Sequence, residues 1–390
     1  MNNLYHHRQH FPALANKAYF NYGGQGTMPQ AAIEAITQAH ATIQELGPFS
    51  NPVSSWIAQE YFATRGAIAS ELNVSPDTIT LTEDVTVGCN IAMWGLNWQQ
   101  GDHLLLSDCE HQGIVATAQE IARRFSVEVT TCPLLNTRNQ GDPCAVIAQH
   151  LRPNTRLVAI SHILWNTGQV LDIDKIAELC IENSSETRLL VDAAQSVGSL
   201  PLDFSNSRVD FYAFTGHKWL CSPAGIGGLY VRAAARESLR PTFIGWRGII
   251  TDSHGQPQDW QPDGRRYEVA TSDVTLYPAL REAIAIHNQW GSTKERYQQI
   301  LQKSAYLWQK LMKLPEIECL RDSPPESGLV SFRLQNTSST NQKLVQYLES
   351  QKIFTRTLAN PNCIRACTHY FTLESEIDKL VETIQEFLGN

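Results

Sequence analysis

The stretch RLLVDAAQSVGSLPLDFSNSRVDFYAFTGHKW (188–219) decides the fold. It holds two apolar β-like runs, RLLVDAA (188–194) and VDFYAF (209–214), and polar side chains follow each of them. Strands that are apolar throughout are typical of a sheet covered by helices on both faces. In such sheets, ligands bind at the carboxyl ends of the strands. The stretch therefore predicts an α/β fold with a site where these two strands end.

The same alternation of strands and helices extends on both sides of this stretch. Further β-like runs are TITLT (78–82), HLLLS (103–107), VEVTTC (127–132), RLVAISHI (156–163) and GIGGLYV (225–231). Helix-like segments between them include IVATAQEIARRF (114–125) and IDKIAELCIENS (173–184). This alternation predicts a mostly parallel sheet.

A different pattern begins near residue 275. A long helical pattern covers residues 278–314, a strand is expected at 329–335, and a terminal helix at 375–389. We therefore expect a smaller αβ domain beside the large one. The expected domains are residues 20–275, and residues 1–19 together with 276–390.

Two further segments lie outside the alternating pattern. The segment 248–266 is polar, rich in Gly and Pro, and too long for a plain connection, so we expect a functional loop there. His6, His7 and His10 are expected to belong to a solvated terminus and not to a metal cluster. The first residues contain no apolar core of a secretory signal.

Composition excludes several classes of protein. The 390 residues include 31 basic and 39 acidic side chains, so the net charge is −8, which is unlike a nucleic-acid binder or a polybasic membrane-binding protein. No apolar run approaches the roughly 18 residues of a membrane span. The nine cysteines are scattered without a C-x-x-C pair, so we expect no metal site, reduced thiols and a cytoplasmic location.

Lys218 and Asp192 are the first candidates for chemistry. A lysine just after a strand can form a Schiff base with an aldehyde, although most lysines are solvated. An acid that ends a buried strand needs a cationic partner, unless it only caps a helix. Gln195 would lie on the same face as Asp192, one helical turn on. If the two strands are neighbours, the lysine and the acid face one crevice, as pyridoxal phosphate requires.

The motifs VDAAQSVG (191–198) and FTGHKW (214–219), with their lysine and acid 26 positions apart, resemble those of fold-type I pyridoxal-phosphate enzymes of the class V aminotransferase group. Within this group the chain is most similar to cysteine desulfurases and to L-cysteine/L-cystine C–S lyases. The resemblance extends from AYFNYGG (18–24) to the terminal helix. It implies a mostly parallel sheet in a large domain plus a smaller C-terminal αβ domain.

The resemblance also implies which residues bind pyridoxal phosphate. Lys218 would bond to the cofactor and act as the catalytic base, and Asp192 would keep the pyridine nitrogen protonated. The other residues implied are Thr86 and Val85 at the phosphate-binding turn, the catalytic His111 on the ring, Asn166 and Gln195 at the ring oxygen, Thr215 and His217 at the phosphate, and Thr271 at the phosphate of a partner subunit. Val85 replaces a usual threonine, so only its backbone N–H could contribute.

Two of these assignments carry further consequences. His162 is an alternative to Asn166 at the ring oxygen, because the stretch SHILWNTGQV (161–170) departs from the desulfurase pattern. If Thr271 reaches a partner subunit, the active site is shared in a homodimer.

The resemblance implies a binding site for an amino-acid substrate. Arg365 would bind the α-carboxylate through its bidentate fork, and Arg356 the same group or a second carboxylate. Otherwise each arginine would only form a surface ion pair. Tyr22, Gly23 and Gly24 match the segment whose backbone lies against the substrate.

Cys363 decides between a lyase and a desulfurase. A desulfurase needs a cysteine thiolate on a mobile loop, which the family places between the two arginines. Here only eight residues separate Arg356 from Arg365, and Pro361 stiffens the segment. We therefore interpret Cys363 as structural and expect β-elimination from L-cystine or L-cysteine, which gives pyruvate, ammonia and cysteine persulfide or sulfide.

A persulfide is a weaker base than sulfide and leaves more easily, which favours cystine. The persulfide could supply iron–sulfur cluster assembly through a sulfur-acceptor protein. The alternatives are a desulfurase that uses Cys363 and yields alanine, another class V enzyme such as an epimerase or a kynureninase-like hydrolase, and a binding protein without turnover. The sequence disfavours a nicotinamide dehydrogenase, because no G-x-G-x-x-G follows a strand.

Overall fold

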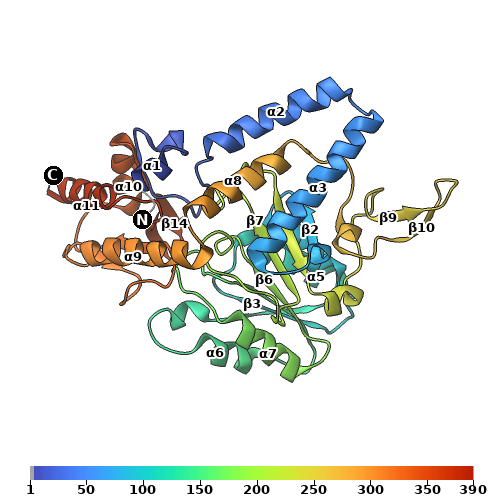
Figure 1. The fold of residues 1–390 in the computed structure, drawn as a ribbon. Helices are drawn as coiled ribbons and strands as arrows, with labels where there is room; N and C mark the ends of the chain where they lie inside the picture. Colours follow the sequence, from blue (N-terminus) through green and yellow to red (C-terminus); the bar gives the residue numbers. More distant parts are fainter. Residues whose placement is uncertain (1–3, 390) are drawn as a thin grey trace.

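The computed structural model describes residues 4–389, which form two main sheets with helices packed against them (Figure 1). The large sheet has the strand order β2-β8-β7-β6-β5-β3-β4. Its strands are β2 (Ile79–Thr82), β3 (His103–Ser107), β4 (Glu128–Cys132), β5 (Thr155–Ser161), β6 (Arg188–Asp192), β7 (Phe211–Thr215) and β8 (Gly227–Val231). Only the pairings of β8 with β7 and β2 are antiparallel. The predicted mostly parallel sheet is confirmed, and β6 and β7 are neighbours.

Helices cover both faces of the large sheet, which gives three layers. One face carries α3 (Asn51–Leu72), α6 (Pro143–His150), α7 (Ile173–Asn183) and α8 (Leu276–Trp290), and α2 (Gln30–Leu46) packs on α8. The other face carries α4 (Val85–Gly95) and α5 (Gln112–Phe125). Because successive strand residues point to opposite faces, Val191 joins the first core and Leu190 the second.

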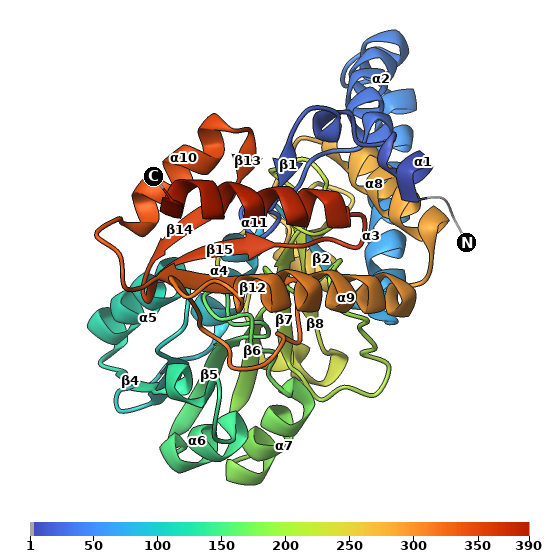
Figure 2. The same cartoon turned by 90° about the vertical axis from the view of Figure 1, so that its left-hand side faces the viewer.

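The smaller sheet is antiparallel and contains β11 (Ile317–Cys319), β12 (Leu329–Leu334), β15 (Asn362–Cys367) and β14 (Arg356–Ala359), in that order. Its helices are α9 (Thr293–Leu311), α10 (Asn341–Ser350) and α11 (Glu374–Gly389) (Figure 2). β1 (Ala18–Tyr19) pairs in parallel with β13 (Ile353–Phe354), so an early segment of the chain joins this unit. The domain boundaries at residues 19/20 and 275/276 stay a prediction.

The helical pattern over residues 278–314 predicted one long helix, and this prediction was wrong. It breaks between α8 and α9 at Gly291 and Ser292. The Ser292 hydroxyl accepts from the Glu295 N–H, and the Glu295 carboxylate accepts from the Ser292 N–H. This capping box satisfies backbone donors at the start of α9 and fixes the break. None of the helices within residues 4–389 is long and apolar enough to cross a membrane.

The segment 248–266, where we expected a functional loop, contains regular β structure. It forms a hairpin of β9 (Ile249–Thr251) and β10 (Pro257–Trp260), which projects from the body of the molecule (Figure 1). Most of the hairpin side chains are exposed.

The expectation of a solvated terminus was wrong for His7. His7 lies on α1 (Leu4–Arg8), is 6% exposed, and its Nε2 lies 2.7 Å from the Tyr370 hydroxyl. The next residue, Arg8, forms an ion pair with Glu376 at 2.7 Å. Both partners follow β15, so α1 is anchored on the smaller unit.

Candidate active site

Asp192 and Lys218 lie at the carboxyl ends of the neighbouring strands β6 and β7. Asp192 is buried, and its Oδ1 accepts the Ala194 N–H at 2.9 Å. Among the described residues, none forms an ion pair with it. Burial raises the pKa of Asp192 and lowers the pKa of Lys218 to about 8, while their mutual attraction opposes both shifts. The two groups predicted to share a crevice are therefore close enough to interact electrostatically.

The backbone just after Lys218 is held by polar side chains. His369 Nε2 donates to the Trp219 carbonyl at 3.0 Å, and His287 Nε2 donates to the Leu220 carbonyl at 2.9 Å. Trp219 Nε1 donates to Gln195 Oε1 at 2.9 Å. These bonds fix the position from which the lysine extends.

Gln195 is already engaged on both ends of its amide. Besides accepting from Trp219, its Nε2 donates to the Gly23 carbonyl at 2.9 Å. Its predicted contact with a ring oxygen would therefore use the second amide hydrogen.

His287 and His369 also lie near the Cys221 thiol, with their ligand atoms within 4.8 Å of one another. The two imidazole rings stack with centroids 5.5 Å apart and 23° between their planes. A metal ion binds in the plane of each imidazole, and nearly parallel planes do not meet at a nearby point. The group therefore lacks the geometry for one shared ion.

His111 precedes α5 as its N-cap residue. Its Nδ1 accepts the Gly113 N–H at 3.2 Å, and its ring lies 6.2 Å from that of Trp165. Burial lowers the pKa of His111, while Asp192 acts in the opposite direction. The side chain thus faces the region of Asp192 and Lys218, whereas its stacking on a cofactor ring stays a prediction.

The predicted phosphate-binding turn lies at the N-terminus of α4. Asp84 caps this helix by accepting the Val87 N–H at 2.9 Å, so the N–H groups of Val85 and Thr86 have no partner within the helix. Such a terminus favours an anion through its free donors and its dipole. A Cβ added to Gly227 would lie 3.1 Å from Thr215 Cα and 3.2 Å from Asp84 Cα, so this helix start adjoins Thr215.

Thr215 and His217 lie together beside this helix start. Thr215 Oγ1 and His217 Nδ1 are 2.6 Å apart, and the pKa of His217 is lowered by burial and by Lys218. Both side chains thus lie beside the start of α4, and their contacts with a phosphate stay a prediction.

Asn166 and His162, the two candidates for a contact with the ring oxygen, lie in different surroundings. Ser161 pairs with Asp192 across β5 and β6, so the two side chains share one face of the sheet. His162 follows on the opposite face, where its Nδ1 lies 2.9 Å from the Tyr212 hydroxyl. Asn166 is buried, and its Oδ1 has no hydrogen-bond partner among residues 4–389. The geometry favours Asn166.

Arg365 and Gly23 lie in direct contact. Arg365 is 2% exposed, its Nη1 donates to the Trp165 carbonyl at 2.9 Å, and its Nε has no partner. A Cβ added to Gly23 would lie 2.8 Å from Arg365 Cζ, so only glycine leaves the guanidinium in place. Tyr22 turns its own ring into the core, 4.9 Å from His369.

Cys363 lies inside the short β14–β15 hairpin, where it pairs with Leu358. Its side chain is fully buried, and burial raises the pKa of the thiol to about 12. The thiol therefore lies in a fixed strand, in its uncharged form.

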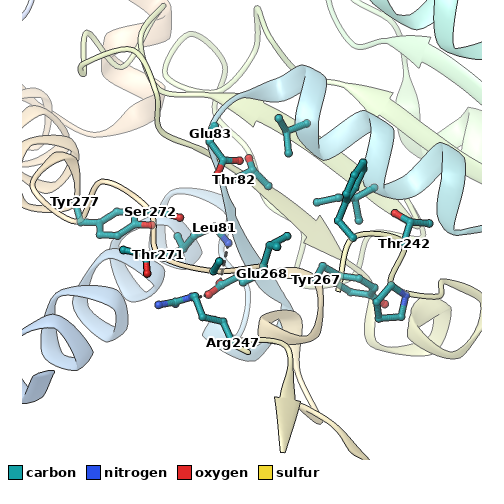
Figure 3. Close-up of a pocket in the computed structure, with 16 residues that line it drawn as sticks. Leu81, Thr82, Glu83, Thr242, Arg247, Tyr267, Glu268, Thr271, Ser272 and Tyr277 are labelled. Atoms are coloured by element: carbon teal, nitrogen blue, oxygen red, sulfur yellow. Dashed lines mark hydrogen bonds and ion pairs between the residues drawn. The ribbon is translucent and has the colours of Figure 1, made fainter. Parts of the chain in front are cut away.

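Thr271 lines a cavity of about 320 Å³ between α4 and the segment after the hairpin (Figure 3). Lys218, Asp192 and Arg365 are not part of its lining. Glu268 closes its floor and accepts from Arg247 at 2.6 Å, and it also binds Arg65. Within a single chain, Thr271 therefore does not lie in the crevice of Lys218. The contact of Thr271 with the phosphate of a partner subunit stays a prediction.

Sequence analysis missed Glu110, a buried acid directly before His111. The sequence signal was that DCEHQG (108–113), which directly follows the run HLLLS (103–107), holds Glu110 between Asp108 and His111.

Comparisons with known proteins agree with this geometry. The family model described as aminotransferase class V matches residues 18–378, which confirms the predicted family. A solved structure of the cystine C–S lyase C-DES with its reaction product cysteine persulfide is 50% identical, with a TM-score of 0.93 over 95% of this chain and 98% of that chain. A mutant of C-DES is described with glycine covalently linked to its PLP cofactor.

Two curated relatives have other activities. Isopenicillin N epimerase of Streptomyces clavuligerus is 28% identical over 97% of this chain and 96% of its own length. Cysteine desulfurase IscS of Shewanella woodyi is 35% identical over 51% of this chain and 50% of its own length.

Proposed function

Because the chain belongs to the class V aminotransferase family, we propose that it is a pyridoxal-phosphate-dependent lyase that cleaves a C–S bond of L-cystine or L-cysteine by β-elimination. The observation that carries this proposal is the short hairpin between Arg356 and Arg365. It holds the Cys363 thiol buried in a strand, so this thiol cannot move to a substrate sulfur. The similarity to the lyase C-DES supports the same conclusion.

The described residues fit pyridoxal phosphate. Asp192 is a buried acid that forms no ion pair within residues 4–389, and a protonated pyridine nitrogen would supply one. Asn166 Oδ1 is buried and has no hydrogen-bond partner in the part of the chain that the structure describes. The free N–H groups at the start of α4, together with Thr215 and His217, would hold the phosphate. His111 would stack on the ring.

The cofactor would supply an aldehyde for the substrate amine and a ring that takes up negative charge from the α-carbon. Lys218 Nζ would remove the α-proton, because its lowered pKa leaves a substantial neutral fraction near pH 8. Asp192 would hold the proton on the ring nitrogen. Arg365, with Gly23 against it, would orient the α-carboxylate.

Arg356 provides a reason to favour cystine. It faces Arg365 across the hairpin and is exposed, with no ion pair among the described residues. The second carboxylate of cystine would reach such a group, whereas cysteine has no second carboxylate. Elimination from cystine releases a persulfide, which is the better leaving group, and the aminoacrylate fragment hydrolyses to pyruvate and ammonia. The persulfide would then be available to a sulfur-acceptor protein.

A homodimer would complete the site through Thr271. The segment that leads to it exposes Phe243, Ile244 and Trp246, each more than half exposed. Large apolar side chains gathered in one segment are typical of a surface that another chain covers. Sedimentation of the purified protein would test this: a monomer at micromolar concentration contradicts the shared site.

A product assay tests the proposed reaction. The cofactor-loaded protein is incubated with L-cystine or with L-cysteine, and pyruvate and alanine are both quantified. We expect pyruvate, faster from cystine, with Cys363→Ala at least half as active as the wild type. Alanine that disappears in Cys363→Ala would instead establish a desulfurase.

Epimerisation is the second candidate, because the Streptomyces epimerase aligns over nearly the whole chain. Chiral chromatography of the amino acid left after incubation decides it. If the substrate is racemised and no pyruvate forms, the protein is an epimerase and the proposal of a lyase is wrong.

A further inference from the structure

We propose that Glu110 is a positioning residue for His111, because its buried carboxyl group ties the turn after β3 to the end of β5. The proposal rests on the proposed function only in the role given to His111.

The contacts of Glu110 join two neighbouring strands. Its Oε1 accepts from the Ser107 hydroxyl at the end of β3 and from the Ser161 N–H, at 3.1 Å, at the end of β5. Its Oε2 bonds to the Ser161 hydroxyl at 2.8 Å. Ser107 Oγ in turn accepts the Cys109 N–H at 3.1 Å. The residue just before His111 is therefore fixed to the sheet on both sides.

The surroundings of Glu110 disfavour a charge on it. It is 7% exposed, and its pKa is raised to about 7, because the effect of burial, to which Asp192 adds, exceeds the opposite effect of the hydrogen bonds from Ser107 and Ser161. Ser161 is the register partner of Asp192, so the two carboxyl groups lie on the same side of neighbouring strands. Within residues 4–389 no ion pair involves Glu110.

The other titratable groups that face Glu110 are thiols. Cys89 on α4, Cys109 in the same turn and Cys132 on β4 all have a pKa raised by burial, so they are uncharged at neutral pH. They offer no cation that would stabilise a carboxylate.

A neutral Glu110 has a consequence for Asp192. Two buried carboxylates this close repel each other, so one of them tends to keep its proton. If Glu110 is the neutral one, Asp192 can carry the negative charge opposite a ring nitrogen. The Ser161 hydroxyl donates to Glu110 Oε2, and this contact helps to hold the turn that carries His111.

The first test uses the protein without cofactor, so it does not depend on the reaction. A pKa raised by folding means that stability is lost as the pH rises toward about 7. We expect the melting temperature of Glu110→Gln, relative to the wild type, to rise from pH 5 to pH 8. Asp108→Asn, an exposed acid in the same turn, is the matched control and should show no such trend. If the difference in melting temperature between Glu110→Gln and the wild type does not depend on pH, Glu110 is not a neutral acid in the folded protein.

The second test reads the placement of His111. We expect the circular dichroism of the bound cofactor to be kept in Glu110→Gln and lost in Glu110→Ala. With substrate, Glu110→Ala should lower kcat about tenfold with little change in KM. The positioning role is overturned if Glu110→Gln and Glu110→Ala change the dichroism and kcat equally, or if Glu110→Ala changes neither. If the wild type has no lyase activity, the proposed function fails, and the melting and dichroism results still decide this proposal.

Discussion

Arg356 and Arg365 face each other directly across the β14–β15 ladder, so two guanidinium groups lie on one side of the same hairpin. Like charges placed directly opposite each other destabilise a strand pair. Among the described residues, no carboxylate pairs with either arginine. The hairpin is thus arranged for an anion that has to come from outside the chain.

Arg356→Gln should therefore stabilise the protein in the absence of substrate while weakening the binding of cystine. We expect about 0.5 kcal/mol of added stability in urea unfolding and a KM for cystine raised roughly tenfold. Arg333→Gln is the control, because Arg333 lies on the neighbouring strand and pairs with Glu318 at 2.7 Å. A KM that is unchanged in Arg356→Gln would remove Arg356 from substrate binding.

Gly23→Ala should displace the Arg365 guanidinium, since the new Cβ would lie 2.8 Å from its Cζ. Overpacking of this kind costs about 1–3 kcal/mol of stability, and we expect a higher KM for any α-amino acid. Gly66→Ala is the control, because a Cβ added to this half-buried glycine of α3 meets nothing within 4 Å. Equal KM values for the two variants would contradict the contact.

The pKa of Lys218 predicts how the protein takes up its cofactor. Only the neutral amine attacks an aldehyde, and burial lowers the pKa of this amine to about 8. The rate of pyridoxal-phosphate binding should rise roughly tenfold from pH 6 to pH 7 and level off above about pH 8. Stopped-flow absorbance measures this rate, and Lys218→Arg should give no covalent adduct. A rate that still rises tenfold between pH 9 and pH 10 would show an ordinary lysine.

The buried His7 predicts a loss of stability in acid. Burial lowers its pKa from 6.5 to about 4, so the folded protein binds fewer protons than the unfolded chain, and stability falls as the pH drops below 6.5. At pH 5 this contribution is about 2 kcal/mol. His7→Gln should lose stability at pH 7.5 and lose less further stability by pH 5 than the wild type. His40→Gln, exposed on α2, should follow the wild type at both pH values.

The sheet and its central pair of residues could be predicted because their signals are local. Apolar runs ending in Asp192 and just before Lys218 indicated two strands of a mostly parallel sheet, and the structure shows that these strands are neighbours. The break at Gly291 and Ser292 also had a local signal, a serine followed three residues later by Glu295, which the helical periodicity outweighed.

Other features depend on partners that are distant in sequence. His7 is buried by Tyr370, which is 363 positions away, and no pattern around His7 indicates this contact. Glu110 acquires its role from Ser161 on another strand. The turn of His162 away from Asp192 follows from the register of β5 and β6, which a sequence does not give.

Glu268 binds Arg65 of α3, Arg247 and the Leu81 N–H of β2 with one buried carboxylate. A single group thus joins the sheet edge, a helix and the segment that carries Trp246 and Thr271. Backbone amides in these parts should exchange with deuterium as one cooperative unit and not as an independently opening loop. A second subunit would then meet a surface that is already ordered, so its association would lose little conformational entropy.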